Sequence, residues 1–552
     1  MNKVHPANLG GMISRFKIVI QPLAVLVYII SILASHYNWA DNLGLFSGLS
    51  WMFYLSVALL LFSFLVSISG HDMRTAITSA LMIQIFFSLS GFLVAGLGGS
   101  QPNFTGEVGY FVAVNFVLHN SIAAIIPHSA AYGGWPVPLL LYGSLLSIVG
   151  VSSQPQPVLI ISQIGFSVFD FILMLAIVTA VFGKVGMYRA FGVLVYSFGG
   201  HYIPAVLDDI GLTYTFFLLI LLVLLSNRLG FRSAILILLS TGVVLSNFYA
   251  SMMLGAVLLM AGLITKDFRR PLAYFSVLFF WLLFGFPSLY VGLIQHSAMA
   301  ILNVGLLFTQ FAAAAVGGSL AHHTIVVVTI TEDAIFAVWA IILLLVLWIR
   351  RLDQYRLSSK FALYIFSMAV FTIIVGPAFS LNPIESLERA YFLSFPLFVL
   401  MISNGMGRSP SQFALILLII LAPLSIITMY GPVVTTYVSP AQESGGTFLE
   451  HHSVFPQNFY ALVPTKINSP AINTYYFTDY RDVFESSFIP LNYSDLQSSM
   501  SGHASGVYAL GHSTRVYISA YTDSVREYEL AQRALASANL VYSSQDMLFY
   551  YH

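Results

Sequence analysis

LNPIESLERAYFLSFPLFVLMISNGMGR, residues Leu381–Arg408, joins a polar turn with one arginine to an apolar run and a second arginine. If the run lies in a bilayer, the two arginines lie near opposite faces of that bilayer. The first of them, Arg389, is therefore informative only in relation to the other cations of the chain. Those cations decide which face each arginine occupies.

The composition of the chain is that of a membrane protein. Of its 552 residues, 58% are hydrophobic and 8% are charged, and the mean hydropathy is +0.85. A soluble domain carries about 25% charged residues, so this chain has too few to cover a water-facing surface. The zero net charge gives no basic field for nucleic acid. The absence of cysteine excludes disulfides, iron–sulfur clusters and thiolate zinc sites.

Apolar runs recur along the first 430 residues and predict a mainly α fold, a polytopic bundle of about 13 to 15 transmembrane helices. The runs are Ile18–Ser35, Trp51–Ile68, Ala76–Leu97, Pro138–Gly150, Val158–Phe182, Phe191–Val206, Leu212–Leu225, Ala234–Leu245, Met252–Ile264, Leu272–Ile294, Ala334–Trp348, Phe361–Phe379, Phe392–Ile402 and Phe413–Met429. Two segments stay open. Ile301–Leu320 is expected to be a re-entrant or surface segment on the outer side, and Phe111–Gly150 forms either two spans or none.

Lysine and arginine in short loops predict the orientation, because such loops are mostly cytoplasmic. Lys3, Arg15 and Lys17 place the N-terminus inside. The run after them lacks a small-residue cleavage site, so we expect a first anchor and not a cleaved signal. With alternating spans, every lysine and arginine before residue 432 can be cytoplasmic except Arg389. Arg389 is expected on the outer face.

The composition changes after Met429. Residues 431–552 are polar, rich in Tyr and Ser, and contain no spanning run. Strand-like pieces at Gly506–Leu510, Arg515–Ala520 and Met547–Tyr551 alternate with a helical segment, Ser524–Ala538. With the C-terminus on the outer side, this part is expected to be a small extracytoplasmic α/β domain.

The outer face of this layout combines many carboxylates with one arginine. The acids expected there are Asp41, Glu107, Asp208, Asp209, Glu332, Asp333, Glu385 and Glu388. The planar guanidinium fork matches phosphate oxygens, so Arg389 beside lipid predicts a site for a lipid phosphate. The alternative is that Arg389 pairs with Glu385, one turn earlier on a helix start. Asp170, inside an apolar run, is expected to face a polar interior, because a charge in lipid is costly.

Glu107 lies in the first long outer loop, residues 98–138. Its carboxylate can act as a general base or hold a divalent cation, or it is simply a solvated loop acid. Histidines on the same side are His119, His128, His201, His296, His322 and His323. Adjacent histidines point in different directions on a helix, which argues against a metal shared by the last two. Acids at a helix N-terminus favour the helix dipole, which explains Glu332 and Asp333 without a function.

Several signatures of known chemistry are absent from the sequence. It contains no GxxxxGK[ST], no HExxH and no GxSxG, and no large cytoplasmic domain is expected. ATP-driven transport and sugar-nucleotide chemistry inside the cell are therefore not expected.

Two motifs resemble archaeal membrane glycosyltransferases of the GT-C type. The first is the turn Tyr132–Pro136, YGGWP, which leads into an apolar run ending in Ile148–Gly150. The second is the late helix opened by Glu388–Tyr391, ERAY. A small outer C-terminal domain with Tyr-rich strands is also similar to that family.

The resemblance implies a donor sugar linked to a polyprenyl phosphate and an acceptor outside the cell. It implies that Glu107 serves the acceptor or a divalent metal and that Arg389 binds the donor phosphate. The family's loop usually offers an aspartate with a second acid nearby, whereas Glu107 stands alone, so metal use stays open. Residues expected to line the outer cavity are His119, Tyr132, Trp135, Asp208, Asp209, His322, His323, Glu332, Asp333 and Glu385.

The resemblance and the change in composition after Met429 together predict three parts. These are an N-terminal two-helix addition at residues 1–75, a transmembrane domain at 76–430 with the outer loop 98–138 and an outer segment 295–333, and the outer domain at 431–552. Three functions remain. The first is a glycosyltransferase of the cell envelope, with the lipid bilayer, the lipid-linked sugar and the acceptor as partners. The second is a non-catalytic protein that binds lipid-linked glycans or scaffolds the envelope, and the third is a transporter.

Overall fold

The structure is a computed structural model of the whole chain. It describes residues 6–35, 48–97, 101–102, 156–183, 186–199, 209–225, 232–246 and 268–284, and isolated positions between 251 and 266. Beyond these it describes positions within 395–403, pieces of 437–462, and residues 488–489, 507–511, 525–536, 538–543 and 547–551. All structural statements below concern these residues.

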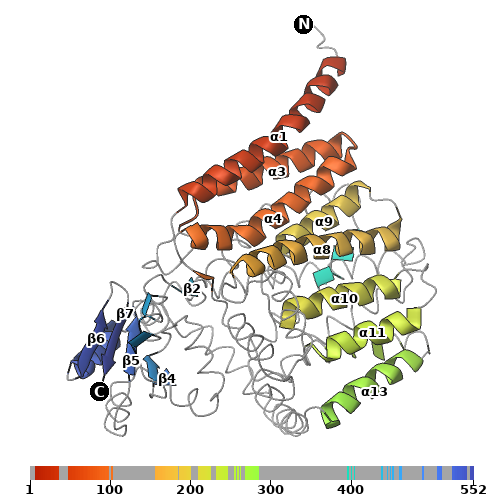
Figure 1. The fold of residues 1–552 in the computed structure, drawn as a ribbon. Helices are drawn as coiled ribbons and strands as arrows, with labels where there is room; N and C mark the ends of the chain where they lie inside the picture. Colours follow the sequence, from red (N-terminus) through yellow and green to blue (C-terminus); the bar gives the residue numbers. More distant parts are fainter. Residues whose placement is uncertain are drawn as a thin grey trace.

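The described part is mainly helical, and its long helices stack side by side (Figure 1). They are α1 (Pro6–Ala34), α3 (Trp51–Ser69), α4 (Met73–Leu97), α8 (Gln156–Phe182), α9 (Met187–Gly199), α10 (Asp209–Leu225), α11 (Arg232–Val244) and α13 (Arg269–Phe284). Three stretches are long and apolar enough to cross a membrane, namely Trp51–Ser69, Met73–Gly91 and Ile164–Phe182. Shorter apolar helical stretches are Val19–Ala34, Gly211–Leu225, Ala234–Val244 and Pro271–Trp281.

Helices α1, α3 and α4 pack into one unit. The Gln21 amide of α1 donates to the Thr75 carbonyl (3.0 Å) and to Ser79 Oγ (2.9 Å), both on α4. Further along, the ring of Tyr28 stacks on Phe86 of α4 with 3.9 Å between ring centroids. These contacts follow the same order along both helices, so α1 and α4 run parallel. Helix α3 connects them and runs antiparallel to both.

A tight turn of three residues, Gly70 to Asp72, joins α3 to α4. Gly70 bonds back to the last carbonyls of α3, and His71 takes the left-handed conformation with φ 58°. The Asp72 carboxylate accepts bonds from the Thr75 amide (3.3 Å) and hydroxyl (2.7 Å). Asp72 is thus the N-cap of α4, a structural role that explains one of the few acids in this part of the chain.

The basic residues of α1, α4 and α9 lie at one end of the stack. Phe191 of α9 contacts Phe64, near the end of α3, whereas Phe198 contacts Phe87, in the second half of α4. Helix α9 therefore runs parallel to α4, and its start lies beside the α3–α4 turn. We call this the basic end; the lysines and arginines that lie toward it are Arg15, Lys17, Arg74 and Arg189.

A late segment, described at positions within 395–403, packs against α9 through two glycines. Phe395 lies against Gly199, whereas Val399 and Ser403 lie against Gly192. The segment is therefore antiparallel to α9, and Phe395 lies farther from the basic end than Ser403. Since a glycine has no side chain, the two backbones can approach closely at both positions.

The C-terminal part forms a mixed five-stranded sheet in the order β4-β3-β5-β7-β6. Its strands are β3 (Phe459–Leu462), β4 (Phe488–Ile489), β5 (Val507–Gly511), β6 (Asn539–Ser543) and β7 (Met547–Tyr551). Helix α25 (Val525–Leu535) covers it and buries Tyr528, Ala531 and Leu535 against Tyr508 and Leu510. Partial burial raises the pKa of the Tyr550 hydroxyl on β7.

Most helix positions follow the apolar runs, with one clear difference. α3 begins at the expected Trp51, and α8 and α10 end at the expected Phe182 and Leu225. α1 begins earlier, at Pro6, because its first turns are polar and carry no apolar signal. The predicted strands Gly506–Leu510 and Met547–Tyr551 match β5 and β7, whereas Arg515–Ala520 lies outside the described residues.

Candidate functional site

Of the residues expected to form the outer site, the structure describes Asp209 alone. Asp209 is the first residue of α10. The others lie outside the described residues and stay predictions. They are Glu107, His119, Tyr132, Trp135, Asp208, His322, His323, Glu332, Asp333, Glu385 and Arg389.

A short ribbon joins residues just after α4 to the start of the C-terminal part. β1 (Gln101–Pro102) pairs antiparallel with β2 (Tyr437–Val438), with Gln101 opposite Val438 and Pro102 opposite Tyr437. β1 follows the end of α4 that points away from the basic end. We call this the strand end. The sequence did not reveal the ribbon, because two-residue strands carry no periodic pattern.

A pair of cysteines can test the ribbon directly, since the natural chain contains none. Gln101→Cys with Val438→Cys is expected to cross-link readily under mild oxidation, because opposite residues of an antiparallel pair lie about 4.5–5.5 Å apart, within disulfide range. The matched control keeps Gln101→Cys and moves the second cysteine to Ala461 on β3, which pairs with β4 and β5. Equal cross-linking of the two pairs on a denaturing gel would contradict the ribbon.

A buried acid lies near the middle of α8. Asp170 is fully buried, and its Oδ1 lies 2.8 Å from the Thr215 hydroxyl of α10. The same hydroxyl lies 3.3 Å from the Gly211 carbonyl, one turn earlier on α10. Within the described part of the chain, the second carboxyl oxygen, Oδ2, has no hydrogen-bond partner. The sequence predicted a polar environment for this acid but not the partner.

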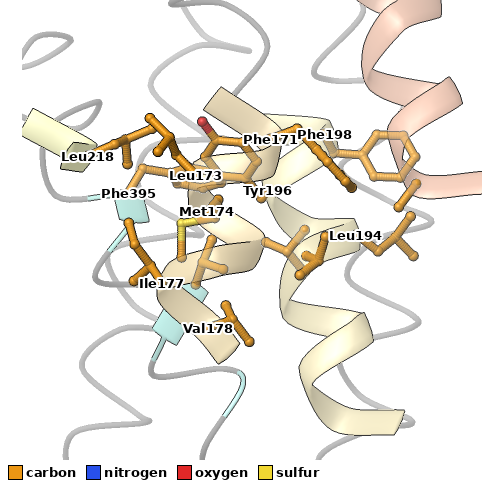
Figure 2. Packing of buried hydrophobic residues seen from close by; sticks show 14 of the residues in the cluster. Phe171, Leu173, Met174, Ile177, Val178, Leu194, Tyr196, Phe198, Leu218 and Phe395 are labelled. Atoms are coloured by element: carbon orange, nitrogen blue, oxygen red, sulfur yellow. The ribbon is translucent and has the colours of Figure 1, made fainter. Parts of the chain in front are cut away.

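Two tyrosines complete this environment. Tyr196 of α9 and Tyr214 of α10 are buried, and their hydroxyls interact electrostatically with each other and with Asp170. Figure 2 shows Tyr196 among Phe171, Leu173 and Phe395, the last of which stacks on its ring at 6.1 Å. We call Asp170, Thr215, Tyr196 and Tyr214 the acid cluster.

A second polar group lies one turn away on α8. The Gln84 amide of α4 donates to the Ser167 carbonyl (3.0 Å), and the Ser167 hydroxyl donates to Ser88 Oγ (2.8 Å). All three side chains are buried. These bonds fix α4 against α8 and orient the face that carries Asp170.

A cavity of about 220 Å³ lies between α11 and α13. Its walls are mostly apolar, and Arg269 stands among the lining residues. Such a groove fits a hydrocarbon chain better than a polar substrate. Among the described residues, no three His, Asp or Glu side chains are grouped to hold a metal ion.

The described structure thus defines a mainly helical protein with three helices able to span a membrane and a buried acid between α8, α9 and α10. Comparison with known proteins found no matching family, no matching curated protein and no matching solved structure.

Proposed function

We propose that the chain is a multi-pass membrane glycosyltransferase of the GT-C type. It transfers a sugar from a polyprenyl-phosphate-linked donor to an acceptor outside the cell. In this proposal the basic end faces the cytoplasm, following the preference of lysine and arginine for that side. The strand end faces outward and holds the reaction.

One observation supports the proposal most. Both proposed site residues are only a few residues in sequence from described residues at the strand end. Glu107 follows β1 by five residues, and β1 lies at that end. Arg389 precedes Phe395 by six residues, and Phe395 is the part of its segment farthest from the basic end. A base and a phosphate-binding cation are therefore both expected on one face of the membrane.

In the proposed reaction the acceptor attacks the anomeric carbon as the bond to the lipid phosphate breaks. Glu107 removes the acceptor proton, or holds a divalent metal that lowers the acceptor's affinity for that proton. The Arg389 guanidinium binds the phosphate and stabilises the charge that grows on it. The β1–β2 ribbon ties the loop of Glu107 to the C-terminal part, which makes that part a candidate for acceptor recognition.

A transporter is the second candidate, and Asp170 is the observation that favours it. Ionisable side chains buried in a membrane often lie on ion or proton pathways. The two functions differ in what they need outside the membrane, since a transporter requires neither Glu107 nor a sugar donor.

Glu107→Gln tests the glycosyltransferase proposal. Purified full-length protein is incubated with a radiolabelled polyprenyl-phosphate hexose and membranes that supply acceptors, and labelled product is counted. The variant is expected to lose activity by about 10²- to 10⁴-fold, the usual contribution of a general base. The matched control is Asp72→Asn, which changes a capping acid near the basic end and leaves the outer face intact. Equal transfer by wild-type and Glu107→Gln would contradict the proposal.

A further inference from the structure

The proposed function does not use one feature of the acid cluster. The cluster can hydrogen-bond Asp170 in either charge state without moving a heavy atom. A hydroxyl carries one hydrogen. When Asp170 is ionised, the Thr215 hydroxyl donates that hydrogen to Oδ1 at 2.8 Å. When Asp170 is protonated, the acid donates to Thr215, which turns its hydrogen to the Gly211 carbonyl at 3.3 Å.

The residues around Asp170 determine whether its ionised form has a counter-charge. A bare carboxylate among apolar side chains is costly, and no ion pair from a described residue reaches Asp170. Tyr196 of α9 and Tyr214 of α10 interact with it. Gln84 of α4 bonds one turn away, at Ser167. Arg189 lies two turns before Tyr196 at the basic end, and Asp209 begins α10. Because no described residue supplies a counter-charge, a bound cation would stabilise the ionised carboxylate.

Oxygen atoms for such a charge are already present. Asp170 Oδ2 and the hydroxyls of Tyr196 and Tyr214 are buried and come from three helices; Oδ2 makes no hydrogen bond within the described part of the chain, and the two hydroxyls interact with each other and with Asp170. Hard cations take oxygen ligands. The atoms number too few for a divalent cation, whose second charge would stay unbalanced by one carboxylate.

We propose that the acid cluster is a binding site within the helix bundle for one monovalent cation. The cation is either a proton on Asp170 or a sodium ion held by Asp170 and the tyrosine hydroxyls. Either cation neutralises the carboxylate, and a sodium ion also joins α8 to α9 and α10 through the same atoms. The site is separate from the sugar-transfer chemistry proposed for the outer face.

Infrared spectra and thermal unfolding of the purified full-length protein test the site. Spectra are recorded over a pH series in choline chloride and again in sodium chloride, for wild-type and for Asp170→Asn. A proton site is expected to give the carbonyl band of a protonated carboxyl that titrates with pH, is absent from Asp170→Asn and is indifferent to sodium. A sodium site is expected to lose that band and unfold at a higher temperature in sodium chloride but not in choline chloride.

Two conservative variants keep the test decisive if Asp170→Asn does not fold. At a sodium site, Tyr196→Phe removes one ligand and is expected to raise the sodium concentration for half-maximal protection about tenfold. At a proton site, Thr215→Val removes the relay and is expected to shift the pH at which the carboxyl band appears. A band and an unfolding temperature that respond to pH and sodium identically in wild-type and in the variants would overturn the proposal.

Discussion

Replacing Arg389 by alanine is expected to reduce sugar transfer from a polyprenyl-phosphate donor by about 10²- to 10³-fold. Removing one preorganised donor to a charge that develops in the transition state typically costs this much. We expect kcat to fall as well as KM to rise, because the phosphate gains charge as the sugar leaves. Steady-state transfer kinetics with the purified full-length protein measure both constants.

The stretch that contains Arg389 supplies its own control. Arg408 closes the same stretch and is expected near the cytoplasmic face, so Arg408→Ala removes the same charge from the opposite side. Arg389→Lys keeps the charge but loses the planar fork, and is expected to retain an intermediate activity. If Arg389→Ala and Arg408→Ala have the same transfer kinetics, Arg389 does not bind the donor phosphate.

If Arg389 only forms an ion pair with Glu385 on the helix surface, a different pattern of variant activities is expected. Arg389→Ala and Glu385→Ala would then have equal and small effects, since an exposed pair contributes about 0.3–0.5 kcal/mol. The two readings differ by more than one order of magnitude in rate, so the kinetic comparison separates them.

The sequence predicted the helices better than the contacts between them. Apolar runs marked the start of α3 and the ends of α8 and α10, since burial in lipid demands an uninterrupted apolar stretch. The polar beginning of α1 gave no such signal. The partner of Asp170 lies 45 residues later in the chain, and only the packing of α8 on α10 brings Thr215 to it.

The boundary expected at residue 75 stays a prediction. It rested on a resemblance, and it falls at the start of α4, just after the short turn to α3. Side chains of α1, α3 and α4 share one buried core with α8, α9 and α10. The buried core thus extends across residue 75.

Adding one methyl group at Gly199 is expected to destabilise the protein by about 1–3 kcal/mol, the usual cost of overpacking a close contact. The new Cβ would lie 2.7 Å from Cε2 of Phe395, a ring that is itself buried and stacked on Tyr196. Thermal unfolding of the full-length protein in detergent is expected to show a lower midpoint for Gly199→Ala.

Two further variants identify the cause of that loss. Gly165→Ala adds the same methyl group to α8, where a Cβ meets nothing within 4 Å, and is expected to leave the midpoint unchanged or slightly higher. Phe395→Leu removes the clashing ring, so the double variant Gly199→Ala, Phe395→Leu is expected to lose less than the sum of the two single losses. Additive losses would mean that the segment after Arg389 does not pack on Gly199, and the direction inferred for that segment would fail with it.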